Sequence, residues 1–315
     1  MIPAGLADQA GPAFRLRWAT SSLDQAGPAS GAAEHRPFLK LFTAPAVITA
    51  AIFVVAMFAI LQYSVRAHIP GSLDVGGFTL ANFAGMLRPL YAWVFIDTVW
   101  LCLLTAVLSL IFGYPLAYAL VRSHSLSVKS FILITTVTPL FLGEVVRTYS
   151  WIVVLGNNGF INSLLLQLGI IAQPIQLLFT VTGVTIALVH VTLPVVVVML
   201  AAAIAHIDPA YEKAAESLGA GPVRVFLTVT LPLSGPGIVA GLTTAFAWTF
   251  SAFATPQLVG GGKVNMVSNL VYQLGFSNFN FPFAAALCVA GLALTYVSIA
   301  AMRITLRPLE KVGLH

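Results

Sequence analysis

The stretch YEKAAESLGAGPVRVFLTVTLP, Tyr211–Pro232, is a polar, glycine-punctuated segment between two long apolar runs. Its first apolar residues recur at the i, i+3, i+4 and i+7 positions of a helix, which predicts one apolar stripe: Tyr211, Ala214, Ala215 and Leu218. The charged side chains occupy the other side of that helix: Glu212, Lys213 and Glu216. The pattern predicts a short amphipathic helix between two membrane-length segments.

Signals at both ends set the limits of this helix. Asp208 is suited to the N-cap and Pro209 to the first helical position. Gly219 follows the last apolar residue and suits the left-handed position that often ends a helix. Pro222 then begins a second short helix, which continues toward Pro232. We therefore expect two short amphipathic helices at an angle to each other.

The composition places the chain in a membrane. Hydrophobic residues make up 59% of the 315 residues, charged residues only 8%, and the mean hydropathy is +0.95. Six apolar segments are long enough to cross about 30 Å of hydrocarbon as a helix: approximately 42–63, 92–121, 130–155, 178–205, 232–254 and 281–302. The expected fold class is an all-α membrane protein with six transmembrane helices. The apolar run 163–172 is too short for a seventh crossing and is expected to be an interfacial or re-entrant helix.

Basic residues are unevenly distributed between the two sides that six crossings create. One side receives only Arg66, Arg88 and Lys263, whereas the other receives the remaining basic residues outside the spans. The positive-inside rule therefore predicts that both termini and the segment 211–232 are cytoplasmic. Residues 1–40 are rich in Ala, Gly, Ser and Pro and are expected to be a disordered cytoplasmic arm, followed by a transmembrane domain over 41–315.

Several classes of function have no support in the sequence. The net charge of +5 comes from scattered residues, without the basic stripe and interleaved aromatics of a nucleic-acid-binding protein. Cys102 and Cys288 lie in apolar runs without partners at metal-ligand spacing, so we expect small packing residues and no metal site. The glycines at 260–262 lack the lysine and hydroxyl of a nucleotide-binding loop, and no catalytic constellation is evident. We expect a protein without catalytic activity of its own.

Two interpretations of the 211–232 segment follow from its periodicity. It could rest on lipid headgroups, or it could bind another protein at the membrane surface. A lipid-bound helix usually presents bulky apolar residues with basic flanks, whereas Ala214, Ala215 and Gly219 form a low surface that another protein can approach closely. The small residues favour a protein partner.

The same residues resemble the EAA motif of inner-membrane permease subunits in binding-protein-dependent ABC importers. The motif residues Ala214, Ala215, Gly219, Leu231 and Pro232 match, whereas Val229 replaces the usual Ile and Lys213 the usual Glu. The resemblance implies a type I ABC importer permease fold, in which this cytoplasmic coupling helix docks on an ATPase subunit. The residues expected to couple to the ATPase are Glu212, Lys213, Ala214, Ala215, Glu216, Leu218 and Gly219.

Three further stretches resemble the polyamine branch of that superfamily: GYPLAYAL at 113–120, RTYSWIVVLGNNGFINSLLLQLGII at 147–171 and FNFPFAAAL at 279–287. The resemblance implies a bacterial inner-membrane permease for a small, cationic, spermidine- or putrescine-like solute; opines, amino-acid-like compounds, ferric ion and thiamine remain alternatives. It also implies a second permease subunit, two cytoplasmic ATPase subunits and a periplasmic solute-binding protein. ATP and magnesium would be bound by the ATPase, and this chain would bind no cofactor.

Polar and aromatic residues inside the spans are candidates for the translocation pathway, because a charge at membrane depth is costly unless it faces protein or water. The candidates are Asp97, Glu144, Arg147, Tyr149, Trp151 and Trp248. Asp97 could face a cationic solute or lie at the outer interface. Glu144 and Arg147 are three residues apart and could instead form a structural ion pair. The three aromatic residues could form a wall for an ammonium group or anchor the spans at the interface. His190, in the fourth predicted span, is expected to be a hydrogen-bonded packing residue.

A different class of protein remains as an alternative. An autonomous secondary transporter would be driven by an ion gradient and would be expected to show an internal repeat or paired broken helices with coordinating groups. Neither feature is evident in the sequence, which favours the ABC importer permease.

Overall fold

The computed structural model describes residues 36–72 and 74–312. The chain divides into two units, Met1–Ala59 and Ile60–His315. The predicted arm over 1–40 lies mostly outside the described residues. Helix α3 (Arg36–Ser64) begins within the last five residues assigned to that arm.

Helix α3 makes up the described part of the first unit, and it ends in the second. Large apolar side chains are exposed all around it, including Ile52, Phe53, Val54 and Val55. A helix that is apolar on every face is suited to hydrocarbon, where the surrounding lipid is as apolar as the side chains. The span predicted at 42–63 is therefore present as a helix of membrane length.

The second unit is almost entirely helical. A short antiparallel hairpin of β1 (Arg66–His68) and β2 (Val75–Phe78) is its only described departure from the expected all-α class. The remaining elements follow in order: α4 (Ala81–Met86), α5 (Pro89–Arg122), α6 (Leu126–Phe141), α7 (Glu144–Leu155), α8 (Phe160–Gln167), α9 (Val181–Ala205), α10 (Pro209–Ser217), α11 (Pro222–Val225), the π-helical η1 (Phe226–Thr230), α12 (Leu231–Leu233), α13 (Gly235–Ser251), α14 (Ala254–Val259), α15 (Val267–Tyr272), the π-helical η2 (Gln273–Ser277) and α16 (Phe281–Val312).

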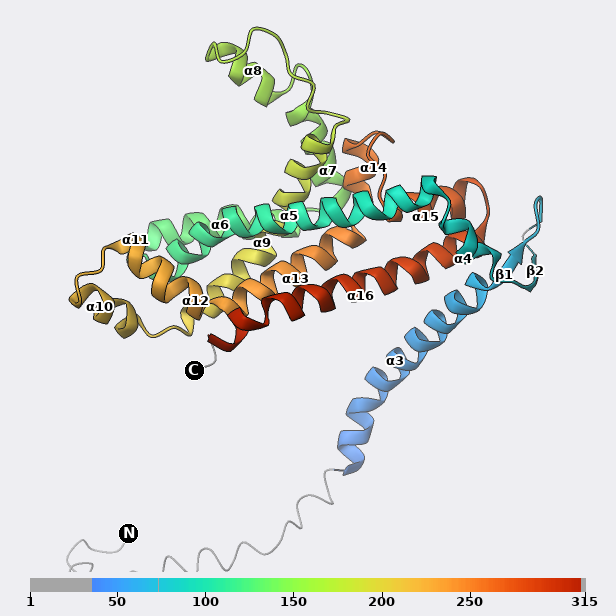
Figure 1. Ribbon diagram of the computed structural model, residues 1–315, viewed down its shortest axis with the longest axis horizontal. Coiled ribbons are helices and arrows are strands. Elements are labelled where there is room, and N and C mark those ends of the chain that lie inside the picture. Colours follow the sequence, from blue (N-terminus) through green and yellow to red (C-terminus); the bar gives the residue numbers. More distant parts are fainter. Residues whose placement is uncertain (1–35, 73, 313–315) are drawn as a thin grey trace, which may run out of the picture. The chain divides into compact units, whose positions relative to one another are not determined.

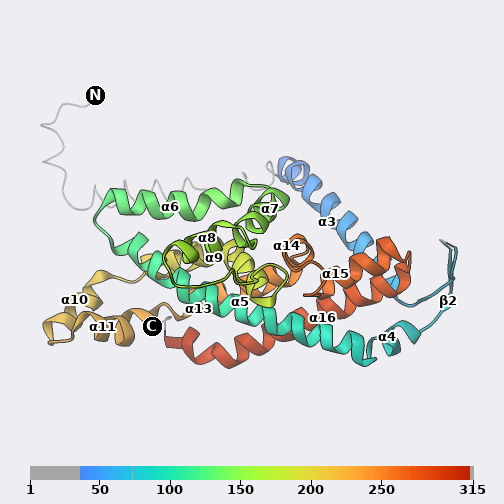
Figure 2. The same cartoon turned by 90° about the horizontal axis from the view of Figure 1, so that it is seen from above.

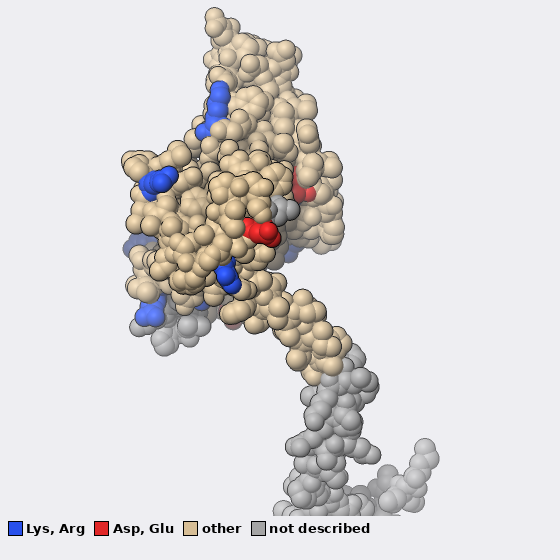
Figure 3. All heavy atoms as spheres, turned by 90° about the vertical axis from the view of Figure 1, so that its right-hand side faces the viewer, with Lys and Arg blue, Asp and Glu red and all other residues tan. Residues whose placement is uncertain are grey.

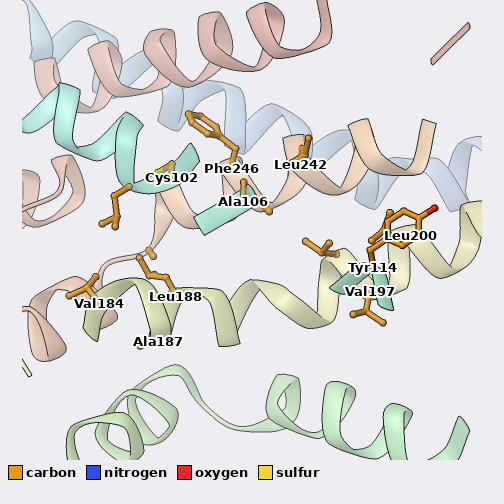
Figure 4. Packing of buried hydrophobic residues seen from close by; sticks show 14 of the residues in the cluster. Cys102, Ala106, Tyr114, Val184, Ala187, Leu188, Val197, Leu200, Leu242 and Phe246 are labelled. Carbon is orange, nitrogen blue, oxygen red and sulfur yellow. The ribbon is translucent and has the colours of Figure 1, made fainter. Parts of the chain in front are cut away.

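Four long helices, α5, α9, α13 and α16, form the centre of this unit and lie side by side in both ribbon views (Figure 1, Figure 2). The buried cluster comes mainly from three of them, and Figure 4 shows its side chains pointing into the space between these helices. Cys102 and Ala106 come from α5, Leu188 from α9 and Phe246 from α13. The expectation that Cys102 packs in the core is confirmed, whereas Cys288 is exposed in this chain.

Close contact between the central helices depends on small and hydroxyl-bearing residues. A Cβ atom on Gly113 of α5 would lie 3.2 Å from Cγ1 of Val196 on α9, so the two helices approach closely there. One helical turn away, the hydroxyls of Ser109 and Thr192 lie 2.6 Å apart, fully buried. Small residues at helix contacts and hydroxyl pairs across them are characteristic of packing within membranes, where no hydrophobic driving force operates between helices.

The predicted third span, 130–155, is broken, which the sequence analysis did not foresee. Helix α6 ends at Phe141, α7 begins at Glu144, and the segments Leu126–Phe141 and Glu144–Gln167 meet at 113°. The backbone leaves helical geometry at Leu142 and Gly143, with ψ angles of 133° and 144°. These two residues form a bend that mean hydropathy conceals.

The predicted fifth span, 232–254, begins at a bend. The segments Pro222–Leu233 and Gly235–Ser251 meet at 68°. Before the bend, η1 widens the helix, so that the amide of Leu231 donates to the carbonyl of Phe226, five residues earlier. Pro232 has no amide hydrogen, and the wider turn accommodates a residue that could not continue regular α-helical bonding. The bend therefore lies at the start of the predicted span, most of which is the single helix α13.

By length and composition, four helices can cross a membrane: Thr43–Ser64, Pro89–Arg122, Val181–Ala205 and Phe281–Leu309. The two bent pairs raise the number of candidate crossings among the described residues to six, which agrees with the prediction. In the view of Figure 3, charged side chains are few and scattered over a largely uncharged surface, as expected for a protein embedded in lipid.

Candidate functional site

The two helices predicted after Asp208 are present at one end of the four central helices (Figure 1). The carboxylate of Asp208 accepts a hydrogen bond of 2.8 Å from the amide of Ala210, and Pro209 is the first residue of α10. At the other end, Gly219 has a φ of +86°. The amides of Gly219 and Ala220 donate to the carbonyls of Glu216 and Ala215, at 2.9 and 3.1 Å. This is a Schellman ending, and the predicted limits of the helix are confirmed.

The apolar stripe of α10 is open to the surroundings. Leu218 is 90% exposed and Tyr211 58% exposed, and Ala214 is exposed beside them. Lys213, the residue that departs from the motif, is also exposed. An exposed apolar surface of this kind is typical of a site that binds another protein or a membrane surface.

Glu212, which is among the residues predicted to couple to the ATPase, does not belong to this exposed surface. It is only 9% exposed. Its carboxylate lies 3.1 Å from Nε of Arg122, the last residue of α5, and accepts a 2.8 Å hydrogen bond from the hydroxyl of Thr230. Helical periodicity groups Glu212 with the other charged residues of α10, but it does not show which neighbouring elements cover the polar side of this helix.

A row of residues on α5 also escaped the sequence analysis. Tyr114, Tyr118 and Arg122 follow at intervals of four along α5, and they meet a similar row on the opposite segment: Phe226, Thr230 and Ser234. The hydroxyls of Tyr114 and Ser234 lie 2.6 Å apart, and both tyrosine rings contact Phe226 edge to face. The i, i+4, i+8 spacing at the polar end of a span was the available signal.

A cavity of about 530 Å³ lies between the break that separates α6 from α7 and the C-terminal end of α13. Its lining includes three of the predicted pathway residues, Glu144, Arg147 and Trp248. The other lining residues come from α6, α9, α13 and α14 and from the turns that follow α6 and α13: Leu140, Leu142, Val191, Ser251, Ala252 and Thr255. A larger groove of about 1030 Å³ between α13, α15 and α16 has no charged lining residue. The polar cavity is the better candidate for contact with a charged solute.

Glu144 and Arg147 do not form the predicted ion pair. Glu144 is exposed, whereas Arg147 is only 8% exposed and donates from Nη1 to the carbonyl of Pro139 at 2.9 Å. That carbonyl belongs to the last turn of α6, where the helix dipole favours a positive charge. Arg147 therefore stabilises the bend between α6 and α7, and its Nε has no hydrogen-bond partner among the described residues.

The three aromatic candidates do not form one wall. Trp248 lines the cavity, and Tyr149 is exposed. Trp151 packs against the central cluster and donates from its indole to Nδ1 of His190 at 3.2 Å. The prediction that His190 is a hydrogen-bonded packing residue is confirmed.

Asp97 lies outside the cavity lining. It is exposed on α5, on the side that also exposes Trp93 and Trp100. Within the part of the chain that the structure describes, no group of His, Cys, Asp or Glu residues is arranged to hold a metal ion. Glu144 is therefore the acid that the structure places at the cavity.

Comparison with known proteins identifies the chain's relatives. The family described as "Binding-protein-dependent transport system inner membrane component" matches residues 109–309, well over half of the chain. The chain belongs to this family. The permease is 33% identical over 210 residues to the spermidine/putrescine transport system permease protein PotB of Salmonella typhimurium, covering 66% of this chain and 72% of that protein. It is also 34% identical over 199 residues to the molybdenum transport system permease protein ModB of Escherichia coli, covering 62% and 85%.

A solved bacterial alginate ABC transporter, in complex with its alginate pentasaccharide-bound periplasmic protein, has the same fold. The TM-score is 0.70, with 18% sequence identity, over 88% of this permease and 96% of that chain. The predicted fold class is thereby confirmed as that of an ABC importer permease. The permease is a multi-pass inner-membrane protein of a transport system that depends on a binding protein.

Proposed function

We propose that the permease forms half of the membrane pathway of an ATP-driven importer, with α10 docked on a cytoplasmic ATPase subunit. The observation that carries this proposal is the exposed stripe on α10, formed by Tyr211, Ala214 and Leu218 at one end of the bundle. The complete importer would contain a second permease subunit, two ATPase subunits and a periplasmic binding protein. ATP and magnesium would act on the ATPase, and this chain would bind neither.

The proposed solute is a small polyamine-type cation. The identity to a spermidine/putrescine permease supports it, as do an acid and an aromatic face in one cavity, Glu144 and Trp248. A carboxylate attracts an ammonium group, and the face of a tryptophan ring can bind one by a cation–π interaction. Because Arg147 is bound to the end of α6, its charge is partly offset by the helix dipole there.

Reconstitution tests this function. Proteoliposomes that contain both permease subunits and the ATPase, supplied with ATP inside and loaded binding protein outside, should accumulate labelled putrescine or spermidine. Omission of the ATPase should abolish accumulation. Uptake that continues without ATP and follows an imposed ion gradient would contradict the proposal and favour a secondary transporter.

The solute site can be tested with one substitution inside the cavity and one outside it. Glu144→Gln should raise the KM for polyamine uptake by about ten- to a hundredfold, because a charge-assisted contact contributes on the order of 1.5–3 kcal/mol. Asp97→Asn, which does not alter the cavity lining, should leave KM within about twofold. Initial uptake rates at several polyamine concentrations measure both variants. The reverse outcome would place the solute at Asp97 instead.

The orientation of the permease is proposed from the positive-inside rule, with both termini and α10 in the cytoplasm. Ser217 and Lys263 are exposed, and they lie in segments assigned to opposite sides. With both native cysteines replaced by alanine, Lys263→Cys should react with a membrane-impermeant maleimide added outside intact spheroplasts. Ser217→Cys should react only after the membrane is opened. Labelling of both from outside would overturn the orientation.

A further inference from the structure

One ion pair is present among the side chains that the structure describes, and it lies at the base of α10. Glu212 and Arg122 are mostly buried, with side chains only 12% and 16% exposed, and their closest atoms are 3.1 Å apart. The carboxylate of Glu212 also accepts a hydrogen bond from Thr230 of η1. Arg122 in addition donates from Nη2 to the carbonyl of Ile207, which follows α9, at 2.9 Å. Two side chains thus connect α5, the end of α9, α10 and η1.

Few other polar contacts attach α10 to the rest of the chain. Ser217, for instance, bonds only to the carbonyl of Lys213 in the same helix. Among the described residues, Glu212 is the one side chain of α10 that forms a hydrogen bond outside that helix. The chain that leaves α10 passes through Gly219 and Gly221, and a Cβ at either position would meet no atom within 4 Å. The attachment through side chains is therefore concentrated on one carboxylate.

An ion pair between Arg122 and Glu212 is well suited to pass a displacement of α10 on to α5. Burying two charges costs desolvation energy, so an apolar pair of similar size would hold two helices together at least as well. A guanidinium and a carboxylate, however, fix the direction of their contact, because the donors of arginine lie in a rigid plane. Apolar surfaces can slide past each other, whereas this arrangement keeps the start of α10 at a defined angle to the end of α5.

We propose that Arg122 and Glu212 are positioning residues that transmit the displacement of α10 by the ATPase to α5, one of the four central helices. The pair itself would contact neither ATPase nor solute. This inference rests on the proposed function, in which α10 docks on the ATPase. It predicts that breaking the pair separates ATP hydrolysis from transport while leaving the docking surface intact.

The test compares full importer complexes in proteoliposomes. Glu212→Gln and Arg122→Gln should retain the ATPase in pull-down and continue to hydrolyse ATP. The number of solute molecules taken up per ATP hydrolysed should fall about tenfold, within the range typical of coupling between two sites. Tyr114→Phe is the matched control, because it removes the contact with Ser234 in the same row but leaves the ion pair in place. Its uptake per ATP should remain within about twofold of the unaltered permease.

The exchanged variant Arg122→Glu/Glu212→Arg provides a second test, which is needed if the single variants reach the membrane only in small amounts. Measured on assembled complexes, it should recover part of the uptake per ATP that the single variants lose, because it restores the ion pair but not the bond from Arg122 to the carbonyl of Ile207. Unchanged uptake per ATP in assembled complexes of both single variants would overturn the inference. So would loss of the ATPase from those complexes, because Glu212 would then belong to the docking surface.

Failure of this inference can be distinguished from failure of the proposed function. If Ala215→Glu releases the ATPase while Glu212→Gln transports normally, the ATPase docks on α10, but the ion pair does not transmit the displacement of α10 to α5. If Ala215→Glu changes neither ATPase binding nor uptake, the docking proposal itself fails.

Discussion

Gly219→Val is expected to reduce polyamine uptake to near background by loosening the ATPase from the permease. Gly219 has a φ of +86°, a left-handed conformation that a β-branched residue adopts only at a cost of about 1–2 kcal/mol. A Cβ there would meet no atom of this chain, so the variant is expected to insert and fold in the membrane. The penalty acts on the Schellman ending of α10, and with it on the position of Leu218 in the docking stripe.

Gly219→Asn is the matched control, because asparagine tolerates the left-handed region far better than valine does. It should retain most of the bound ATPase. Ala215→Glu tests the same surface without changing the backbone, since it places an unpaired charge within the apolar stripe. Pull-down of the ATPase and uptake in proteoliposomes provide the measurements. Normal assembly and uptake in both Gly219→Val and Ala215→Glu would contradict docking on α10 and favour the alternative, in which this helix rests on lipid headgroups.

Gly237→Val is expected to have the largest effect on stability. A Cβ on Gly237 of α13 would overlap the Cβ of Ala203 on α9, and neither atom belongs to a flexible side chain that could move away. The two helices would have to separate, and overpacking of this kind costs about 3 kcal/mol or more where the backbone cannot adjust. We expect much less permease in the membrane and a lower midpoint of thermal unfolding in detergent.

Gly241→Ala provides the control on the same helix. A Cβ at Gly241 would lie 3.6 Å from Cγ1 of Val196, an ordinary van der Waals contact, so the midpoint should change by no more than a few degrees. Thermal unfolding of both variants is measured, with the exposed Cys288 replaced by alanine, by the fluorescence of a thiol-reactive dye that reacts with the buried Cys102 as the permease unfolds. Equal midpoints for Gly237→Val and the unaltered permease would show that α9 and α13 are not in close contact.

The sequence alone determined the class of the protein and the local form of α10. Apolar segments of membrane length predict spans because backbone groups in hydrocarbon must bond within their own helix, and this constraint is visible in composition. The limits of α10 were predicted equally well by Asp208, Pro209 and Gly219, because a cap, a first-turn proline and a left-handed ending depend on residues only a few positions apart.

Only the tertiary structure decided which charges are free and which are bound. Glu144 and Arg147 satisfy the spacing of a helical ion pair, yet Arg147 turns to the carbonyl of Pro139 across a bend that mean hydropathy does not register. Glu212 has the sequence context of a solvated residue, but it is buried against Arg122, 90 positions away. Periodicity specifies the face of a helix on which a side chain lies. Which element covers that face is set by packing between distant segments, and a single sequence carries no local signal for it.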